Sequence, residues 1–531
     1  MLRPIFRDVG ALLAGVLSVC SFAPFSLWFV APCALALFFW CCHAPSHAGR
    51  FRRTFLRGWL FGVGQFSAGI FWIAQSFQFN HIPYPLAVVA TSGLVAVLAL
   101  YPACYAGAMS RLVPAATWSL APALAWPGAW VGIEWLRGTL FTGFTWLQLG
   151  GSQIDGPFSG WYPLLGTYGV GLLVAGLGST LVWGCYKRTW RAGAIGLGVV
   201  AASALVSFLI DGQVLGGKWT RPAGEPLTFA LVQGNVSQGE KWKPENKAPT
   251  LARYLSHSRA NWNADVIVWP ETAVPGLLTR MTPFLDEVER EARSHGAEVI
   301  VGIPSVDPQT RRPVNVVVAL GTGSQPRAGT RAGTTANDSQ AFPTYVKRHL
   351  VPFGEYLPLP RWFGPIVEAI GLRLSNFQSG RADQPLLMVS GHPVGVTVCY
   401  EIAFSHDVRT ALPQARLLLN VSNDAWFGDT LGPHQHLEMA RVRAKESGRY
   451  VVRSTNTGIT AIIDSDGVVR AAAEQFVDTV LVGQVVPRSG ATPYVRVGDV
   501  PVVGTVLVLL FVGVALSNRA VHDGAQTREN S

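Results

Sequence analysis

The feature that most constrains this fold is a series of long apolar windows, seven before a polar segment and one after it. A helix needs about 20 apolar residues to cross the hydrocarbon core of a bilayer. The chain is 49% hydrophobic and only 14% charged, which is untypical of a soluble protein. We therefore predict about eight membrane spans, near residues 8 to 22, 25 to 42, 58 to 79, 86 to 109, 116 to 136, 161 to 185, 193 to 210 and 500 to 517.

The first two apolar windows are short and share the break Phe22-Ala23-Pro24-Phe25, which predicts a helical hairpin. Arg3 and Arg7, followed by an apolar stretch, also resemble the start of a secretory signal peptide. No small-residue cleavage site separates this stretch from the next apolar window. The sequence therefore favours an uncleaved membrane anchor.

Basic residues between the windows predict the orientation, because short loops rich in Lys and Arg stay cytoplasmic. With seven spans in residues 1 to 210 and both termini inside, the polar segment 211 to 499 lies on the outer face, the periplasm of a bacterial cell. Residues 518 to 531 are then a cytoplasmic tail. The net charge of +10 follows largely from this topology, and the dispersed basic residues do not favour nucleic-acid binding. The residues assigned to the cytoplasmic side are Arg3, Arg7, Arg50, Arg52, Arg53, Arg57, Arg111, Lys187, Arg188, Arg191 and Arg519.

Cys399 is the only one of the seven cysteines that lies outside the apolar windows. A free cysteine is usually a small buried apolar side chain. In the oxidising periplasm, however, a single thiol cannot form an internal disulfide, and its position at the end of a β-branched run is typical of a nucleophile. Packing is the better interpretation for the other six, which are Cys20, Cys33, Cys41, Cys42, Cys104 and Cys185.

From Leu227 onward, short apolar runs alternate with helix-compatible stretches. Such β-branched runs separated by helices predict an α/β domain whose strands are buried on both faces. The predicted helices are 250 to 262, 283 to 295 and 434 to 447. The predicted strands are 227 to 233, 266 to 269, 299 to 303, 314 to 320, 345 to 350, 394 to 399, 417 to 421, 451 to 454 and 459 to 464.

Residues 321 to 340 interrupt this pattern. They are poor in apolar residues and rich in Gly, Thr and Ser. This composition predicts a flexible surface loop between two strands.

Two further reactive side chains occur at apolar runs in the polar segment. Glu271 follows the strand predicted to end at Trp269, and Lys347 lies in the run that begins at Tyr345. Active sites of α/β folds lie at the carboxyl ends of strands, so Glu271, Lys347 and Cys399 could converge. A thiol needs a base or a cation to react, a carboxylate can move its proton, and an ammonium can stabilise an oxyanion. Together the three residues predict acyl transfer through a thioester, although each alone has an ordinary structural explanation.

A Glu, a Lys and a Cys in this chain order resemble the carbon–nitrogen hydrolase (nitrilase) superfamily. With the predicted spans and the blocks YVKRHLVPFGEYLP, VTVCYE and SNDAWFG, the chain resembles the apolipoprotein N-acyltransferase family over nearly its whole length. The resemblance implies a helical membrane bundle with an inserted nitrilase-like αββα sandwich. It also implies Glu271 as general base, Lys347 as oxyanion stabiliser and Cys399 as nucleophile. The residues implied to support catalysis or contact substrate are Trp242, Glu355, Tyr400, Glu401, Trp426 and Phe427.

The reaction implied by the resemblance starts from a phospholipid, which donates an acyl chain to Cys399. The thioester is then attacked by the α-amino group of a diacylglyceryl-modified N-terminal cysteine of an apolipoprotein. Both partners are anchored in the bilayer, which explains why a catalytic domain is joined to membrane spans. No cofactor or metal is implied.

The pair His434 and His436 has the spacing of a partial zinc site. No third Cys, His or carboxylate stands nearby at a suggestive spacing. A structural role at the start of a helix is therefore the preferred interpretation.

Two other functions are compatible with parts of the sequence. A membrane-tethered amidase or nitrilase would use the same three residues but resolve the thioester with water. A transporter with an outer binding module is less favoured, because transport paths are marked by buried charges and the spans contain few ionisable residues, chiefly Glu134. Glu134, Trp135 and Arg137 are interpreted as an interfacial anchor.

Overall fold

The computed structural model describes residues 2–43, 50–80, 82–113, 119–187, 190–211, 219–321, 342–369 and 376–529. The chain divides into two compact units. The first, here called the helical unit, comprises Met1–Ala74, Tyr84–Lys218 and Arg496–Ser531. The second, the sheet unit, comprises Gln75–Pro83 and Trp219–Val495.

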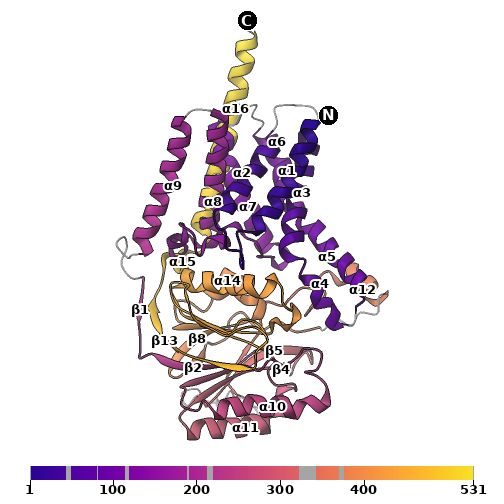
Figure 1. The fold of residues 1–531 in the computed structure, drawn as a ribbon, viewed down its shortest axis with the longest axis vertical. Coiled ribbons are helices and arrows are strands. Elements are labelled where there is room, and N and C mark those ends of the chain that lie inside the picture. Colours follow the sequence, from indigo (N-terminus) through magenta and orange to yellow (C-terminus); the bar gives the residue numbers. More distant parts are fainter. Residues whose placement is uncertain are drawn as a thin grey trace. The chain divides into compact units, whose positions relative to one another are not determined.

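The helical unit is a bundle in which α1 packs on α2 and α3, α3 on α6, and α7 on α8 and α16 (Figure 1). Small residues allow the close approaches that hold helices together in a bilayer. A Cβ on Gly15 of α1 would lie 2.0 Å from the Phe61 carbonyl oxygen, and one on Gly58 of α3 would lie 2.2 Å from that of Pro102. The main helices are α1 (Leu2–Val19), α2 (Val30–Cys42), α3 (Arg50–Ile70), α5 (Tyr84–Leu98), α6 (Leu100–Leu112), α7 (Leu120–Thr139), α8 (Tyr162–Lys187), α9 (Trp190–Asp211) and α16 (Val500–Glu529).

Three helical stretches are long and apolar enough to cross a membrane, among the residues that the structure describes. They are Tyr84–Leu112, Ser159–Tyr186 and Val500–Arg519. Each of the other predicted windows overlaps a helix, including the shorter apolar helices Val30–Cys42 and Ala201–Asp211. The number of about eight spans therefore stays a prediction.

The window predicted at 58 to 79 is wrong in its bounds. Its helix is α3, which begins at Arg50 and ends at Ile70, so the arginines assigned to a loop lie in the helix. The charge of Arg57 is accommodated there because its guanidinium pairs with Asp8 at 2.7 Å and donates to the Cys41 carbonyl at 2.9 Å. The end of the window, Gln75 onward, groups with the sheet unit, where the Phe79 ring meets the Trp426 ring edge-on at 5.5 Å.

The interfacial-anchor interpretation is wrong for Glu134 and Arg137. Both are buried in the helical unit, with 4% and 3% of their surfaces exposed. Arg137 donates to the Trp146 carbonyl at 2.7 Å, and Glu134 accepts the Leu149 amide at 3.0 Å. The chain folds back after α7, so these charges satisfy backbone groups of the returning segment rather than facing a lipid surface.

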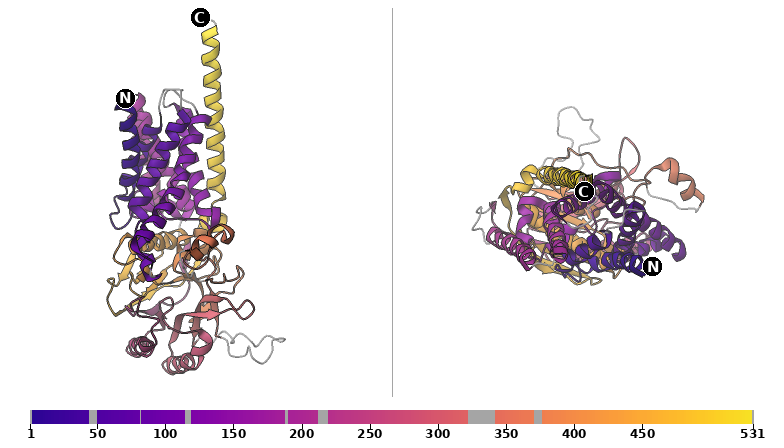
Figure 2. Two further views of the ribbon diagram at one scale, coloured as in Figure 1. Left: turned by 90° about the vertical axis from the view of Figure 1, so that its right-hand side faces the viewer. Right: turned by 90° about the horizontal axis from the view of Figure 1, so that it is seen from above.

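The sheet unit contains two six-stranded sheets with helices on their outer sides (Figures 1 and 2). The first has the order β13-β2-β3-β4-β5-β6 and the second β12-β11-β10-β9-β8-β7. A third, two-stranded sheet pairs β1 (Thr220–Pro222) with β14 (Arg488–Gly490). The strands of the first sheet are β2 (Leu227–Gln233), β3 (Val266–Trp269), β4 (Glu298–Val306), β5 (Pro313–Leu320), β6 (Thr344–Val346) and β13 (Thr479–Val485). Those of the second are β7 (Leu387–Val389), β8 (His392–Val398), β9 (Leu417–Ser422), β10 (Val451–Thr455), β11 (Ala461–Ile463) and β12 (Val469–Ala472).

Side-chain alternation explains the four layers, because successive residues of a strand point to opposite faces. In β2, Phe229 and Leu231 enter the core between the two sheets, whereas Ala230 and Val232 enter the core beneath the outer helices. The outer helices of the first sheet are α10 (Pro244–Arg259) and α11 (Leu278–Ser294), and α14 (Leu431–Ser447) covers the second (Figure 1). The predicted αββα sandwich is thus confirmed.

The predicted strand 345 to 350 is wrong in length, because β6 ends at Val346. Beyond it, the amides of Arg348 and His349 donate to the Glu401 carboxylate at 2.7 and 3.0 Å instead of pairing with a strand. The predicted strand 394 to 399 ends at Val398, and Cys399 begins the short 3₁₀ helix η5 (Cys399–Ala403). The run 459 to 464 pairs only over Ala461–Ile463. Apart from Gly321, the predicted loop 321 to 340 lies outside the described residues.

Candidate active site

Topology brings the ends of several strands to one edge of the sandwich. β2, β3 and β4 are parallel, and two successive antiparallel pairings make β6 run in the same direction as β4. Glu271 and Lys347 therefore follow strands that end at the same edge of the first sheet. In the second sheet, β8, β9 and β10 are parallel, and Cys399 directly follows β8.

The Glu271 carboxylate is buried and held by hydrogen bonds to both oxygens. Asn315 Nδ2 donates to Oε1 at 2.7 Å, and the Asn423 backbone amide donates to Oε2 at 2.9 Å. Burial raises the pKa of Glu271 above its ordinary value, against the opposing effect of the Lys347 ammonium. A carboxyl group with a raised pKa is suited to accepting and returning a proton near neutral pH.

The Lys347 side chain is only 1% exposed and lies between two carboxylates. Its Nζ is 2.8 Å from Glu355 Oε1 and 3.8 Å from Glu271 Oε1. Burial lowers the pKa of Lys347, but Glu355 and Glu271 outweigh this effect and hold the pKa above its ordinary value. The ammonium is therefore charged at neutral pH and available to a developing oxyanion.

Cys399 stands at a strained turn of the backbone. Its φ is +51°, in the left-handed region that residues other than glycine rarely adopt. Burial raises the pKa of the Cys399 thiol to about 12, with Glu271 adding to the rise and Lys347 opposing it. The resting side chain is thus a thiol, and its reaction requires removal of the proton during attack.

Glu401 joins the segments that carry Lys347 and Cys399. Its carboxylate is fully buried and accepts the Val398 amide at 2.7 Å as well as the amides beyond β6. The Tyr345 hydroxyl lies 3.1 Å from both of its oxygens. Glu401 therefore fixes the relative placement of the two reactive segments, which is a structural basis for its expected supporting role.

The aromatic residues expected near the substrate differ in exposure. Tyr400 is buried and packs edge-on against Phe404 at 4.9 Å. Trp242, between β2 and α10, is 53% exposed. Trp426 and Phe427, which follow β9, are partly exposed. The structure thus leaves three of these four side chains accessible, while their contact with substrate stays a prediction.

Among the further polar residues around the three reactive side chains, only those of the block SNDAWFG were singled out for the site in the sequence. Asn315 and Asn423 hold Glu271, and the Asn423 side chain donates to Gln238 Oε1 at 2.7 Å. A further cluster of buried polar residues surrounds Cys399. Its members are Asn420, Ser422, Asp424, His436 and Arg453. Asn420 and Arg453 give a signal in the sequence, because each is a polar residue within a strand that begins with apolar residues.

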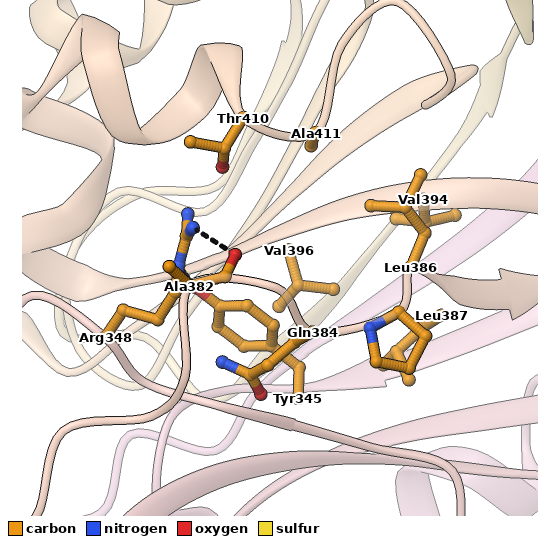
Figure 3. Close-up of a pocket in the computed structure, with 11 residues that line it drawn as sticks. Tyr345, Arg348, Ala382, Gln384, Leu386, Leu387, Val394, Val396, Thr410 and Ala411 are labelled. Atoms are coloured by element: carbon orange, nitrogen blue, oxygen red, sulfur yellow. Dashed lines mark hydrogen bonds between the residues drawn. The ribbon is translucent and has the colours of Figure 1, made fainter.

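A small cavity lies apart from the three reactive residues, beside Tyr345 and Arg348 (Figure 3). Its volume is about 30 Å³, which has room for water molecules but not for an acyl chain. Arg348 Nη1 donates to the Ala382 carbonyl at 3.3 Å at its rim. The cavity is lined by Tyr345, Arg348, Ala382, Gln384, Pro385, Leu386, Leu387, Val394, Val396, Thr410 and Ala411.

Comparisons with known proteins agree with this architecture. Residues 14–180 match the family model described as the apolipoprotein N-acyltransferase N-terminal domain, and residues 228–494 match the carbon–nitrogen hydrolase model. The chain is 40% identical to the apolipoprotein N-acyltransferase of Methylococcus capsulatus, over 97% of this chain and 98% of that protein. It is 36% identical to that of Coxiella burnetii, over 95% of this chain and 99% of that protein.

Among solved structures, the chain matches Saccharomyces cerevisiae Nit3, described as a member of branch 10 of the nitrilase superfamily. The match has 16% identity and a TM-score of 0.35, and it covers 51% of this chain and 93% of that chain. This likeness is too distant to bear on function. The two family models and the near full-length relatives are sufficient: the chain belongs to the apolipoprotein N-acyltransferase family.

Proposed function

We propose that this protein transfers a fatty acyl chain from a phospholipid, through a thioester on Cys399, to the α-amino group of the diacylglyceryl-modified N-terminal cysteine of apolipoproteins. The proposal is carried by the Lys347 ammonium, held 2.8 Å from Glu355 and 3.8 Å from Glu271 beside the strained turn at Cys399. A carboxylate and an ammonium that both act on the charge of a thiol support acyl transfer through that thiol, and the names of the relatives supply the class of acceptor.

In the first half-reaction, Glu271 accepts the proton from the Cys399 thiol while Sγ attacks the ester carbonyl carbon of the phospholipid. The C–O π bond opens to an oxyanion, which the Lys347 ammonium stabilises. When the intermediate collapses, the bond to the glycerol oxygen breaks, and Glu271 returns its proton to this leaving oxygen. The products are a lysophospholipid and an acyl thioester on Cys399.

In the second half-reaction, the α-amino nitrogen of the acceptor attacks the thioester carbonyl. Glu271 takes a proton from this nitrogen, Lys347 again stabilises the oxyanion, and the C–S bond breaks. Sγ recovers the proton from Glu271, and the product is an amide. Glu355 keeps Lys347 charged and in place throughout, Tyr400 supports the site, and Trp242, Trp426 and Phe427 contact the lipid chains.

The proposed location is the bacterial inner membrane, with both termini cytoplasmic and the segment 211 to 499 in the periplasm. Both substrates are then held in the same bilayer as the enzyme. Confinement of this kind replaces a search in three dimensions by one in the membrane plane and holds the reacting groups close together.

The test uses the full-length protein in detergent with a phospholipid labelled in its acyl chain. We expect label on the protein, its release by hydroxylamine, and formation of lysophospholipid. Cys399→Ala should abolish all three, whereas Cys185→Ala, a matched change at an exposed cysteine of α8, should not. Labelling that persists in Cys399→Ala contradicts the nucleophile assignment.

Addition of a diacylglyceryl peptide should then transfer the label to the amino group of the peptide. Hydrolysis of a small amide without any label transfer from phospholipid would favour a membrane-tethered amidase instead. The two functions share their reactive residues, so the identity of the acyl donor and acceptor decides between them.

A further inference from the structure

The backbone of Cys399 adopts a conformation that costs free energy and must be held by its surroundings. The left-handed region is unfavourable for residues other than glycine, and Cys399 has a φ of +51°. This turn also decides where Sγ points, because Cα is the branch point of the side chain. The contacts that hold the backbone of Cys399 therefore influence the position of its Sγ atom.

The Cys399 carbonyl oxygen accepts hydrogen bonds from two side chains. His436 Nε2 lies 3.0 Å from it, and Asn420 Nδ2 lies 3.4 Å from it. A carbonyl oxygen only accepts hydrogen bonds, so Nε2 of His436 carries a hydrogen whether the ring is neutral or charged. The shorter of the two bonds therefore comes from His436, which belongs to α14 and is 1% exposed.

The opposite side of the His436 ring is held by a buried ion pair. Its Nδ1 is 3.1 Å from Asp424 Oδ1 and 3.1 Å from Arg453 Nη2. Arg453 Nη2 also pairs with Asp424 Oδ2 at 2.6 Å. A neutral ring accepts from Arg453 and a charged ring donates to Asp424, so both states keep the ring in the same orientation.

Three further contacts complete the support. Ser422 Oγ donates to Asp424 Oδ1 at 2.7 Å, and Arg453 Nη1 donates to Asn420 Oδ1. Asn420 in turn donates to the Thr397 hydroxyl at 3.1 Å, in the strand that leads into Cys399. The side chains of Asp424 and Arg453 are completely buried, so the network is shielded from competing water.

We infer that His436 is a positioning residue for the nucleophile: held by Asp424 and Arg453, it pins the carbonyl of Cys399 and so directs Sγ toward the site shared by Glu271 and Lys347. The inference rests on the proposed function, because it concerns the thiol that forms the thioester. His436 itself exchanges no proton with substrate. It acts through the geometry of Cys399.

The test compares two substitutions of similar size. His436→Gln keeps an N–H donor near the position of Nε2, whereas His436→Met has no donor. The rate of acyl-enzyme formation from labelled phospholipid is measured in single turnover at several phospholipid concentrations, together with the melting temperature. We expect His436→Met to lower the maximal rate about 100-fold, the cost of a reacting atom misplaced by about 1 Å, with half-saturation changed less than about twofold. His436→Gln should recover most of that rate.

The matched control is His434→Met, two residues earlier on α14, where the ring contacts Gln475 at 3.3 Å and not the network. It should label like the unmodified protein. If His436→Met does not accumulate, His436→Gln is compared with His436→Asn, whose shorter amide does not reach the position of Nε2. Only the glutamine variant should then be fast.

Equal rates of the unmodified protein and His436→Met would overturn the inference, as would equal rates of the glutamine and asparagine variants. Losses of rate that match the loss of folded protein, without recovery in His436→Gln, would reduce His436 to a purely structural role. Persistent labelling of Cys399→Ala would instead defeat the proposed function and leave the geometry around His436 untouched.

Discussion

Replacing Glu271 by Gln should move two reactions of the same thiol in opposite directions. The amide has the shape of the carboxylate and keeps one oxygen that can accept a hydrogen bond. In the unmodified protein, the Glu271 oxygens accept from Asn315 Nδ2 at 2.7 Å and from the Asn423 amide at 2.9 Å. Lys347 retains its 2.8 Å pair with Glu355. We therefore expect the variant to fold, while losing both the proton acceptor and the negative charge beside Cys399.

The size of the effect on acyl transfer follows from the thiol. With the pKa of Cys399 raised to about 12, roughly one thiol in ten thousand is ionised at about pH 8, which corresponds to about 5 kcal/mol. In the proposed mechanism, Glu271 avoids this cost by taking the proton as the bond to carbon forms. General bases contribute about 10²- to 10⁴-fold, so we expect acyl-enzyme formation in Glu271→Gln to fall by at least about 100-fold.

Alkylation should change in the other direction. The Glu271 carboxylate is one of the groups that raise the pKa of Cys399, and Lys347 opposes it. Without the Glu271 carboxylate, one of the effects that raise the pKa of Cys399 is lost while the lowering effect of the Lys347 ammonium remains. The pKa of Cys399 therefore falls, and more thiolate is present between about pH 8 and 10. A small neutral alkylating agent such as iodoacetamide needs no protein base and should react faster with the variant.

Both rates are measured on the same preparation, acylation with labelled phospholipid and alkylation by intact mass, with Cys399→Ala as the blank. The reasoning is refuted if acylation is unaffected at neutral pH, which would mean that another base is responsible. It is also refuted if alkylation slows while the melting temperature is unchanged. A parallel loss of both reactions with a lower melting temperature would show that the amide disrupts the site, against the expectation of an intact fold.

Three other substitutions test neighbouring features of the site. Glu355→Gln removes the carboxylate 2.8 Å from Lys347 Nζ, so the pKa of Lys347 falls and the alkaline limb of the acylation pH profile should move to lower pH. An unmoved limb would exclude a role of Glu355 in keeping Lys347 charged. Gly302→Ala places a Cβ 2.3 Å from the Pro270 carbonyl oxygen and 2.7 Å from Glu271 Cα, so the rate of acylation should fall at least about tenfold. Gly364→Ala, whose Cβ would meet no atom of another segment within 4 Å, should leave the rate of acylation unchanged. Lys241 is fully buried, and burial lowers its pKa from 10.5 to about 8, so the buried charge costs most below pH 8 and this cost fades as the pH rises toward 10.5. Lys241→Met should therefore raise the free energy of unfolding by up to about 3 kcal/mol at about pH 7, seen as a higher melting temperature. A stability gain that grows with pH would contradict this sign.

The central strands could be predicted from the sequence because their signal is local. β2 and β3 have the predicted bounds, since both are largely apolar runs that are mostly buried on both faces. β12 and β13 were missed because their residues alternate between partial burial and exposure at the edges of the sheets. β6 was predicted too long because Leu350 and Val351 resemble a continuation of the apolar run that begins at Tyr345, while Glu401, whose carboxylate accepts the amides of Arg348 and His349, lies more than fifty residues away.

The same distinction applies to the site. Glu271, Lys347 and Cys399 could be singled out because each stands at the end of an apolar run, and parallel strands bring such ends together. His436 was interpreted as a structural residue at the start of a helix, and its contact with the Cys399 carbonyl was not predicted, because that contact spans 37 residues and depends on how α14 packs on the second sheet. Asn315 presents the same difficulty, since its amide meets Glu271 from a different strand. Such partners are set by tertiary packing, which leaves no periodic trace in the sequence.

The grouping of Gln75–Pro83 with the sheet unit, where Phe79 packs on Trp426, limits how this chain can be divided. A gene fragment that starts at Trp219 and ends at Val495 would encode all the strands but lack this aromatic partner. The sheet unit is therefore not encoded by one continuous segment that recombination could transfer intact to another membrane domain. Exchange between relatives should respect this interleaving, with residues near 79 and 426 inherited together or altered as a pair.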